Sequence, residues 1–128
     1  MRRLAVFSKD ARVQGSRILI VEDEMLVAMM IEDMIADMGL VPAAVAGRLQ
    51  QGVDLAGKLD IDAAVLDVNL DGEQSFPVAR VLRERGIPFF FATGYGAKGI
   101  ADEFKQSLVL QKPFNAAELE SAFRSILG

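Results

Sequence analysis

The sequence contains no cysteine, no histidine and no tryptophan. Without cysteine the chain can form neither a disulfide nor a thiolate metal site. Without histidine it has no imidazole for acid–base catalysis, no histidine ligand for a metal and no phosphohistidine of its own. The chemistry left to it is that of carboxylates, hydroxyls and lysine.

Positive charge and long apolar runs are also scarce. Fourteen lysines and arginines stand against eighteen acidic residues, which gives a net charge of -4. A nucleic-acid surface needs positive charge to displace counterions, so we expect no DNA or RNA binding. No apolar run is long enough to span a bilayer, and the stretch at 4–7 is too short for a secretory core. We therefore expect a cytoplasmic protein with no membrane partner.

The length and composition fit one globular domain. The chain has 128 residues, of which 52% are hydrophobic and 25% charged. We expect residues 16–128 to form this domain. Residues 1–15 show no sustained hydrophobic period, which favours a flexible leader. A short extra strand or a partner-binding arm is the alternative for this segment.

Short apolar runs alternate with segments of helical periodicity. The runs predict strands at 17–21, 40–45, 63–67, 89–92 and 108–111. Helices are predicted at 27–38, 48–59, between Ser75 and Gly86, and at 116–127. Pro42 favours an edge position for the second strand, because proline cannot donate to the ladder. Residues 94–107 carry only a short helical signal, at 100–105.

The ends of the third and fourth helices carry further signals. Ser75 is expected to cap its helix, with Pro77 in the first turn. Asn115 with Glu118 three residues later resembles a capping box. Five strands that alternate with helices imply a parallel sheet with right-handed crossovers and helices on both faces. We therefore predict an α/β fold of the flavodoxin-like type.

Polar residues follow these strands at their carboxyl ends. Glu22 and Asp23 follow the first strand, Asp67 ends the third, Thr93 follows the fourth and Lys112 follows the fifth. In a parallel sheet these ends meet at one edge, where functional groups collect. Three carboxylates gathered there repel one another. A hard divalent cation such as Mg²⁺, which prefers oxygen ligands, is the natural partner.

This set of groups suits phosphoryl chemistry. With Mg²⁺ and Lys112 supplying positive charge, the carboxylate of Asp67 can attack the phosphorus of a bound phosphoryl group. Thr93 would donate its hydroxyl to one phosphoryl oxygen, and Lys112 would pair with another. The product is an aspartyl phosphate, which an in-line water can hydrolyse. The modification would therefore be temporary.

Over about residues 16–128 the chain resembles the receiver domain of bacterial two-component systems. The residues that carry this resemblance, in order and register, are Glu22-Asp23, Asp67, Thr93 and Lys112-Pro113. The resemblance implies a five-stranded sheet in the order 2-1-3-4-5, with Asp67 as the phosphoacceptor. It also implies a histidine kinase, or a small molecule such as acetyl phosphate, as the phosphodonor.

The resemblance assigns further roles around the site. Asp23 would bind Mg²⁺ directly, together with Asp67, whereas Glu22 would bind it through water and Asn69 through its main-chain carbonyl. The peptide bond between Lys112 and Pro113 would be cis. Asn69 and Tyr95 stand at variable positions that flank the site and should tune the lifetime of the phosphoryl group.

The run Phe-Ala-Thr-Gly-Tyr-Gly at 91–96 resembles the FAT GUY group of single-domain receivers, which are associated with kinases of the HWE and related types. The chain departs from ordinary receivers at two positions. Val109 stands where an aromatic switch residue is expected, and Asp71 where many receivers carry proline. Because that aromatic residue is missing and Tyr95 is the only tyrosine, we hypothesise that the segment 94–105 orders on phosphorylation.

The output predicted from the sequence is binding of a protein partner. Met25 and Met29 lie off the apolar stripe of the first helix, and with the region after Thr93 they are candidate contact surfaces. Draining phosphoryl groups from a kinase, as a phosphate sink, is the alternative role.

Four other interpretations of the sequence are weaker than that of a receiver domain. The pattern GxGxxG at 94–99 follows the fourth strand, whereas a dinucleotide fingerprint belongs in the first βα turn. A flavin phosphate would meet repulsion from Glu22 and Asp23. A phosphatase or phosphotransferase usually carries a second acid where this chain has Asn69. An interaction module that had lost phosphorylation would not need the acid, threonine and lysine set.

Overall fold

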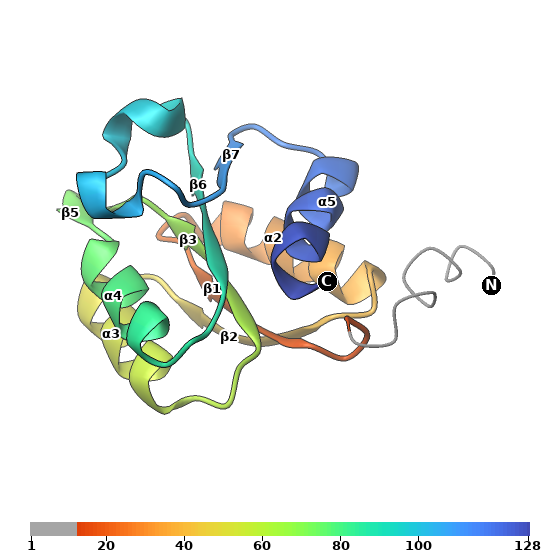
Figure 1. The fold of residues 1–128 in the computed structure, drawn as a ribbon. Coiled ribbons are helices and arrows are strands. Elements are labelled where there is room, and N and C mark those ends of the chain that lie inside the picture. The colour runs from red at the N-terminus through yellow and green to blue at the C-terminus, as the bar shows by residue number, and fades with distance from the viewer. Residues whose placement is uncertain (1–12) are drawn as a thin grey trace.

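The structure, a computed structural model, describes residues 13–128 (Figure 1). Within them five strands form one parallel sheet in the order β2-β1-β3-β6-β7. They are β1 (Arg17–Val21), β2 (Val41–Ala46), β3 (Ala63–Asp67), β6 (Phe89–Thr93) and β7 (Val109–Gln111). Counted along the five strands of this sheet, the order is the predicted 2-1-3-4-5.

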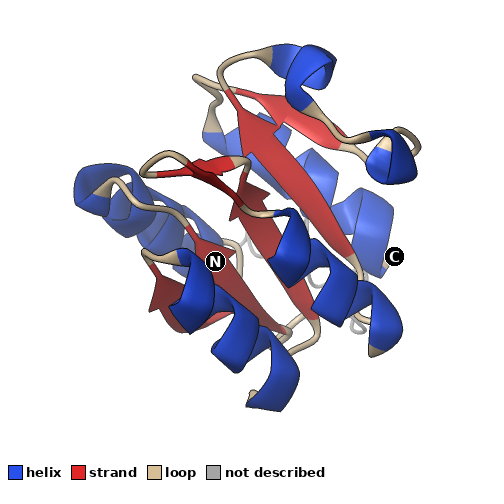
Figure 2. Cartoon of the chain, turned by 90° about the vertical axis from the view of Figure 1, so that its left-hand side faces the viewer, coloured by secondary structure: helices blue, strands red, loops and turns tan. Residues whose placement is uncertain are grey.

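Helices cover both faces of the sheet, as Figures 1 and 2 show. They are α2 (Met25–Asp37), α3 (Leu49–Lys58), α4 (Phe76–Glu84) and α5 (Ala116–Leu127). The pair α2 and α5 packs on one face and the pair α3 and α4 on the other (Figure 1). The predicted α/β fold of the flavodoxin-like type is confirmed.

The central strands read as continuous apolar runs because both of their faces are buried. In β1, Leu19 and Val21 belong to the core under α3 and α4. Ile18 and Ile20, which alternate with them, belong to the core under α2 and α5. All four side chains are at most 1% exposed.

The edge strand β2 explains the position of Pro42. β2 stands at one end of the sheet order. Its pairing with β1 shifts between Ile18, which faces Pro42, and Leu19, which faces Ala44. Proline is tolerated at such an edge irregularity because no ladder hydrogen bond is required of it. The predicted edge position is confirmed.

Helix α2 buries a narrower stripe than its periodicity predicted. Ala28, Ile31 and Ile35 are its buried residues. Met30 recurs at the spacing of the apolar stripe that predicted this helix, but it is 41% exposed, so a core position for it, which that spacing predicts, is wrong. The predicted apolar stripe is thus wider than the face of α2 that the fold buries.

A two-stranded hairpin, β4 (Asn69–Leu70) and β5 (Glu73–Gln74), follows β3 and was not predicted. Its two central residues, Asp71 and Gly72, have φ of 50° and 88°. Positive φ at both central positions is typical of a type I′ turn, for which Asp-Gly is a preferred sequence. Proline could not adopt the positive φ of position 71, so a turn of this type requires another residue there.

The helix caps differ from one another. Asn115 and Glu118 form the predicted capping box, with bonds of 2.8 and 2.9 Å. Ser75 occupies the N-cap position of α4, but its side chain makes no capping hydrogen bond. Its buried Oγ has no hydrogen-bond partner among the described residues. The prediction that Ser75 caps the helix through its side chain was therefore wrong, whereas Pro77 does lie in the first turn.

The segment after β6 is folded as two short 3-10 helices, η1 (Gly96–Gly99) and η2 (Asp102–Phe104). Phe104 is fully buried and its ring lies 5.6 Å from that of Phe91. Val109 packs against the same cluster. The segment is thus folded in the structure, and the hypothesis that it orders on phosphorylation stays a prediction.

Residues 13–15, which the sequence placed in the leader, pack against the domain. Val13 is fully buried in the core under α2 and α5. The backbone N–H of Gly15 donates to the carbonyl of Gly39 at 2.9 Å. The rest of the predicted leader, 1–12, lies outside the described residues.

None of the helices that the structure describes combines the length and the apolar character that a membrane span requires.

Candidate functional site

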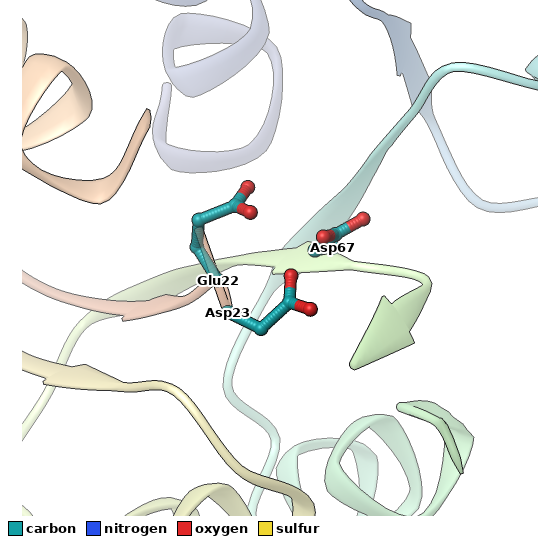
Figure 3. Close-up of side chains that lie close together, drawn as sticks. All are labelled: Glu22, Asp23 and Asp67. Atoms are coloured by element: carbon teal, nitrogen blue, oxygen red, sulfur yellow. The ribbon is translucent and has the colours of Figure 1, made fainter. Parts of the chain in front are cut away.

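The predicted site residues come together at the carboxyl edge of the sheet. Glu22 and Asp23 follow β1, and Asp67 ends β3. Val21 pairs with Leu66 and Asp67 with Ala92, so three neighbouring strands end at the same level. Carboxylate oxygens of Glu22, Asp23 and Asp67 lie within 4.8 Å of one another (Figure 3).

Lys112 joins these acids from the far end of the chain. Its Nζ lies 2.8 Å from Oε1 of Glu22 and 3.4 Å from Oδ2 of Asp67. The side chain of Glu22 is only 1% exposed. Its other oxygen, Oε2, accepts a hydrogen bond from the backbone N–H of Glu24 at 3.1 Å. A carboxylate buried this deeply is stable only because both of its oxygens have partners.

Burial and repulsion raise the pKa of Asp67 to about 7. Burial is the largest cause and the charge of Glu22 is the next, while Lys112 opposes both. For Lys112 burial acts to lower the pKa, but the hydrogen bond to Glu22 and the attraction of Asp67 and Glu22 outweigh it, so the pKa is raised. The site therefore holds a protonated lysine beside a carboxyl group that resists ionisation.

The hairpin is tied to the acidic cluster through Asp23. The backbone N–H of Asp71 donates to Oδ2 of Asp23 at 3.0 Å. Within the turn, Oδ1 of Asn69 accepts from the N–H of Gly72 at 3.1 Å. The side chain of Asn69 is thus engaged in the turn, which is compatible with a role for its main-chain carbonyl.

Thr93 is buried at the end of β6 and is held on two sides. Its Oγ1 accepts a hydrogen bond from the N–H of Tyr95 at 3.1 Å. Its carbonyl accepts from the N–H of Lys112 at 2.9 Å. Gln111, which the sequence did not single out, donates from Nε2 to the carbonyl of Gly94 at 3.2 Å. Gln111 could have been recognised as a site residue only from its pairing with Thr93 across β6 and β7.

Most of these residues line one open cleft of about 440 Å³. Its lining residues are Asp23, Glu24, Asp67, Asn69, Thr93, Gly94, Tyr95 and Lys112. Glu22 lines a neighbouring cleft of about 610 Å³, together with Asp23 and Met25. Asp67, Thr93 and Lys112 thus share one cleft that is open to solvent.

The remaining predicted positions do not line this cleft. Val109 packs against the core beside Phe91. The Lys112-Pro113 peptide bond is cis, as the resemblance implied. Met25 and Met29 are 70% and 51% exposed on α2, so both are accessible on the surface. The second half of the glycine pattern at 94–99 forms η1, and no α-helix follows it directly.

This parallel sheet, with three carboxylates, a threonine and a lysine at its carboxyl edge, has the features of a receiver domain. The family model of the response regulator receiver domain matches residues 18–124. The chain belongs to this family.

Three proteins illustrate the similarity. The solution structure of SdrG from Sphingomonas melonis is 41% identical with a TM-score of 0.79, and the match covers 89% of this chain and 98% of that one. The response regulator PhyR from Brucella abortus is 26% identical with a TM-score of 0.79, over 96% of this chain and 52% of that one. The transcriptional regulatory protein TcrA of Mycobacterium tuberculosis is 34% identical over 90% of this chain and 47% of its own length. The chain thus spans about half the length of the curated relative it matches.

Proposed function

We propose that this chain is a single-domain response regulator that accepts a phosphoryl group on Asp67 from a histidine kinase. The reaction depends on Mg²⁺, and a protein partner reads the resulting conformational change. The observation that carries this proposal is the position of Asp67, 3.4 Å from Nζ of Lys112 in a cleft that Thr93 also lines. A nucleophilic carboxylate, a cation and a hydroxyl donor thus share one open site.

The acidic cluster offers the ligands that Mg²⁺ prefers. Oxygens of Glu22, Asp23 and Asp67 lie within 4.8 Å of one another, and Mg²⁺ commonly takes one or two carboxylates, a carbonyl and waters. Asp23 and Asp67 would bind it directly, with the carbonyl of Asn69, and Glu22 through water. When bound, the ion supplies positive charge that offsets the repulsion among the carboxylates and the phosphoryl oxygens.

The transfer step exchanges one bond to phosphorus for another. An oxygen of ionised Asp67 forms a P–O bond while the P–N bond of the donor phosphohistidine breaks, and its electron pair stays on the imidazole nitrogen. With acetyl phosphate the bond that breaks is P–O and acetate leaves. Lys112 pairs with one phosphoryl oxygen and Thr93 donates its O–H to another. Hydrolysis by water then returns the carboxylate and releases phosphate.

The partners follow from the subgroup that the chain resembles. The run at 91–96 supports membership of the FAT GUY group, and hence a kinase of the HWE or a related type. PhyR from Bartonella quintana is described as an anti-anti-sigma factor. For this chain we propose a protein target of its own in the cytoplasm.

Signalling is favoured over the role of a phosphate sink by the packing near Thr93. The ring of Phe91, two residues before Thr93 on β6, contacts the ring of Phe104 in η2 at a centroid distance of 5.6 Å. A movement of Thr93 on phosphorylation would therefore shift the segment 96–104 through this contact. A sink needs no such link to the surface.

The proposal is tested by intact-mass spectrometry after incubation with acetyl phosphate. We expect one added phosphoryl group on the wild-type chain in the presence of Mg²⁺. Without Mg²⁺, or with Asp67→Asn, we expect no adduct. If no adduct forms with acetyl phosphate or with a phosphorylated histidine kinase, the interaction module without phosphorylation takes the place of this proposal.

A further inference from the structure

Gln111 stands beside Thr93 at the end of the sheet. The two residues are direct partners in the parallel pairing of β6 and β7, two positions after the pair Phe91 and Val109. Side chains two residues apart on a strand point to the same face. Gln111 therefore follows Val109 on the face that carries Phe91 and Thr93, and its amide can reach the turn that leaves β6.

The amide of Gln111 holds this turn by one hydrogen bond and lies against it at Gly96. Its Nε2 donates to the carbonyl of Gly94 at 3.2 Å. Its Oε1 lies against Gly96, where a Cβ atom would approach it to 3.1 Å and where φ is 64°. A side chain at position 96 would thus meet both backbone strain and the amide of Gln111.

The turn from Gly94 to Gly96, held by Gln111, orients the hydroxyl of Thr93. A threonine hydroxyl has one hydrogen to donate and two lone pairs that accept. The N–H of Tyr95 occupies one lone pair of Thr93 at 3.1 Å. With that lone pair engaged, the O–H can still donate a hydrogen bond from the wall of the cleft that Asp67 and Lys112 also line.

We propose that Gln111 is a positioning residue for phosphoryl transfer to Asp67. Its amide fixes the Gly94 to Gly96 turn, the turn aims the N–H of Tyr95 at Thr93, and Thr93 is thereby held as a donor for the phosphoryl oxygen. This role rests on the proposed function, and it assigns to Gln111 no contact with the phosphoryl group.

The test compares rates of phosphorylation by acetyl phosphate and Mg²⁺, followed by intact mass. Gln111→Met keeps the length of the side chain and removes the amide, and we expect it to slow the reaction about three- to tenfold, the effect of one lost hydrogen bond. Gln106→Met makes the same exchange on an exposed glutamine away from the site and should react like the wild type. Both variants should melt within a few degrees of the wild type.

A double-mutant cycle separates positioning from a general structural effect. Because Gln111 acts through Thr93, Gln111→Met should slow the reaction no further in a chain that already carries Thr93→Val. A wild-type rate in Gln111→Met, or an equal loss in both backgrounds, would overturn the positioning role while leaving the phosphoacceptor intact. If the wild-type chain itself takes up no phosphoryl group, the proposed function fails and this role fails with it.

Discussion

Among the residues of the site, Asp67 is a carboxyl group that the fold makes costly to ionise. Its pKa is raised to about 7 by burial first and by the charge of Glu22 second, against an ordinary value of 3.8. A carboxyl group whose pKa is higher in the folded than in the unfolded chain stabilises the fold most at low pH. This stabilisation is lost as the pH rises from about 4 through about 7.

Asp67→Asn should therefore stabilise the chain at neutral and higher pH in buffer without Mg²⁺. We expect a gain of about 1 to 2 kcal/mol at about pH 8 and a smaller one at about pH 5, because the wild-type carboxyl binds its proton there. Urea unfolding at the two pH values measures this. Asp102→Asn, at a fully exposed carboxylate, serves as the control. A gain for Asp67→Asn that is the same at both pH values would contradict the assigned pKa.

Two helix N-caps of this chain should respond differently to alanine. Asn115→Ala removes both a side-chain acceptor and its share of the capping box, so we expect a loss of about 1 kcal/mol. Ser75→Ala removes a buried hydroxyl that has no partner among the described residues, so we expect a change within about 0.5 kcal/mol. Chemical unfolding of both variants measures the difference. An equal loss in the two would show that Ser75 does cap α4.

At the scale of elements, the β4–β5 hairpin fixes one of the carboxylates. The N–H of Asp71 donates to Asp23, and this bond depends on a turn with positive φ at Asp71 and Gly72. The orientation of Asp23 is therefore set by a backbone donor from a neighbouring turn. A substitution in the turn should therefore change the orientation of Asp23 at the metal site without replacing a metal ligand.

Asp71→Pro should weaken Mg²⁺ binding and destabilise the chain by about 1 to 3 kcal/mol. Proline cannot adopt a positive φ and has no N–H to donate to Asp23. Asp71→Gly, the matched control, keeps the N–H and tolerates the φ of 50°. Calorimetric titration with Mg²⁺ and urea unfolding give the two quantities. Binding by Asp71→Pro as tight as that by Asp71→Gly would show that the hairpin does not orient Asp23.

The elements also show what the sequence could predict. The main strands are short, continuous apolar runs, and the acids, threonine and lysine at their ends identify the site without any packing information. The exposure of Met30 depends on which face of α2 packs on the sheet, and the periodicity of this helix does not settle that. The role of Gln111 can be recognised only from its register with Thr93. The hairpin did have a local signal, the Asp71-Gly72 turn, but its strands of two residues have no apolar pattern.

At the scale of the whole molecule, the site exists only once the topology is complete. Two cores lie on opposite faces of the sheet, and the strands that both cores share end at the same carboxyl edge. Glu22 and Lys112, which pair at 2.8 Å, are 90 residues apart in the chain. The buried charge of Glu22 is satisfied only when β7 has docked beside β6. The ion pair of the site is therefore complete only in the fully assembled sheet.

The central claim, that Asp67 is the phosphoacceptor, is tested most directly by locating the modification. An aspartyl phosphate is reduced by borohydride to homoserine, which peptide mass spectrometry places at a single residue. After incubation with Mg²⁺ and acetyl phosphate, we expect homoserine at position 67 and no reduced residue at any other acid, and none without Mg²⁺. Homoserine at Asp23, the longer alcohol 5-hydroxynorvaline at Glu22, or no reduced acid in a chain that carries a phosphoryl group, would contradict this assignment.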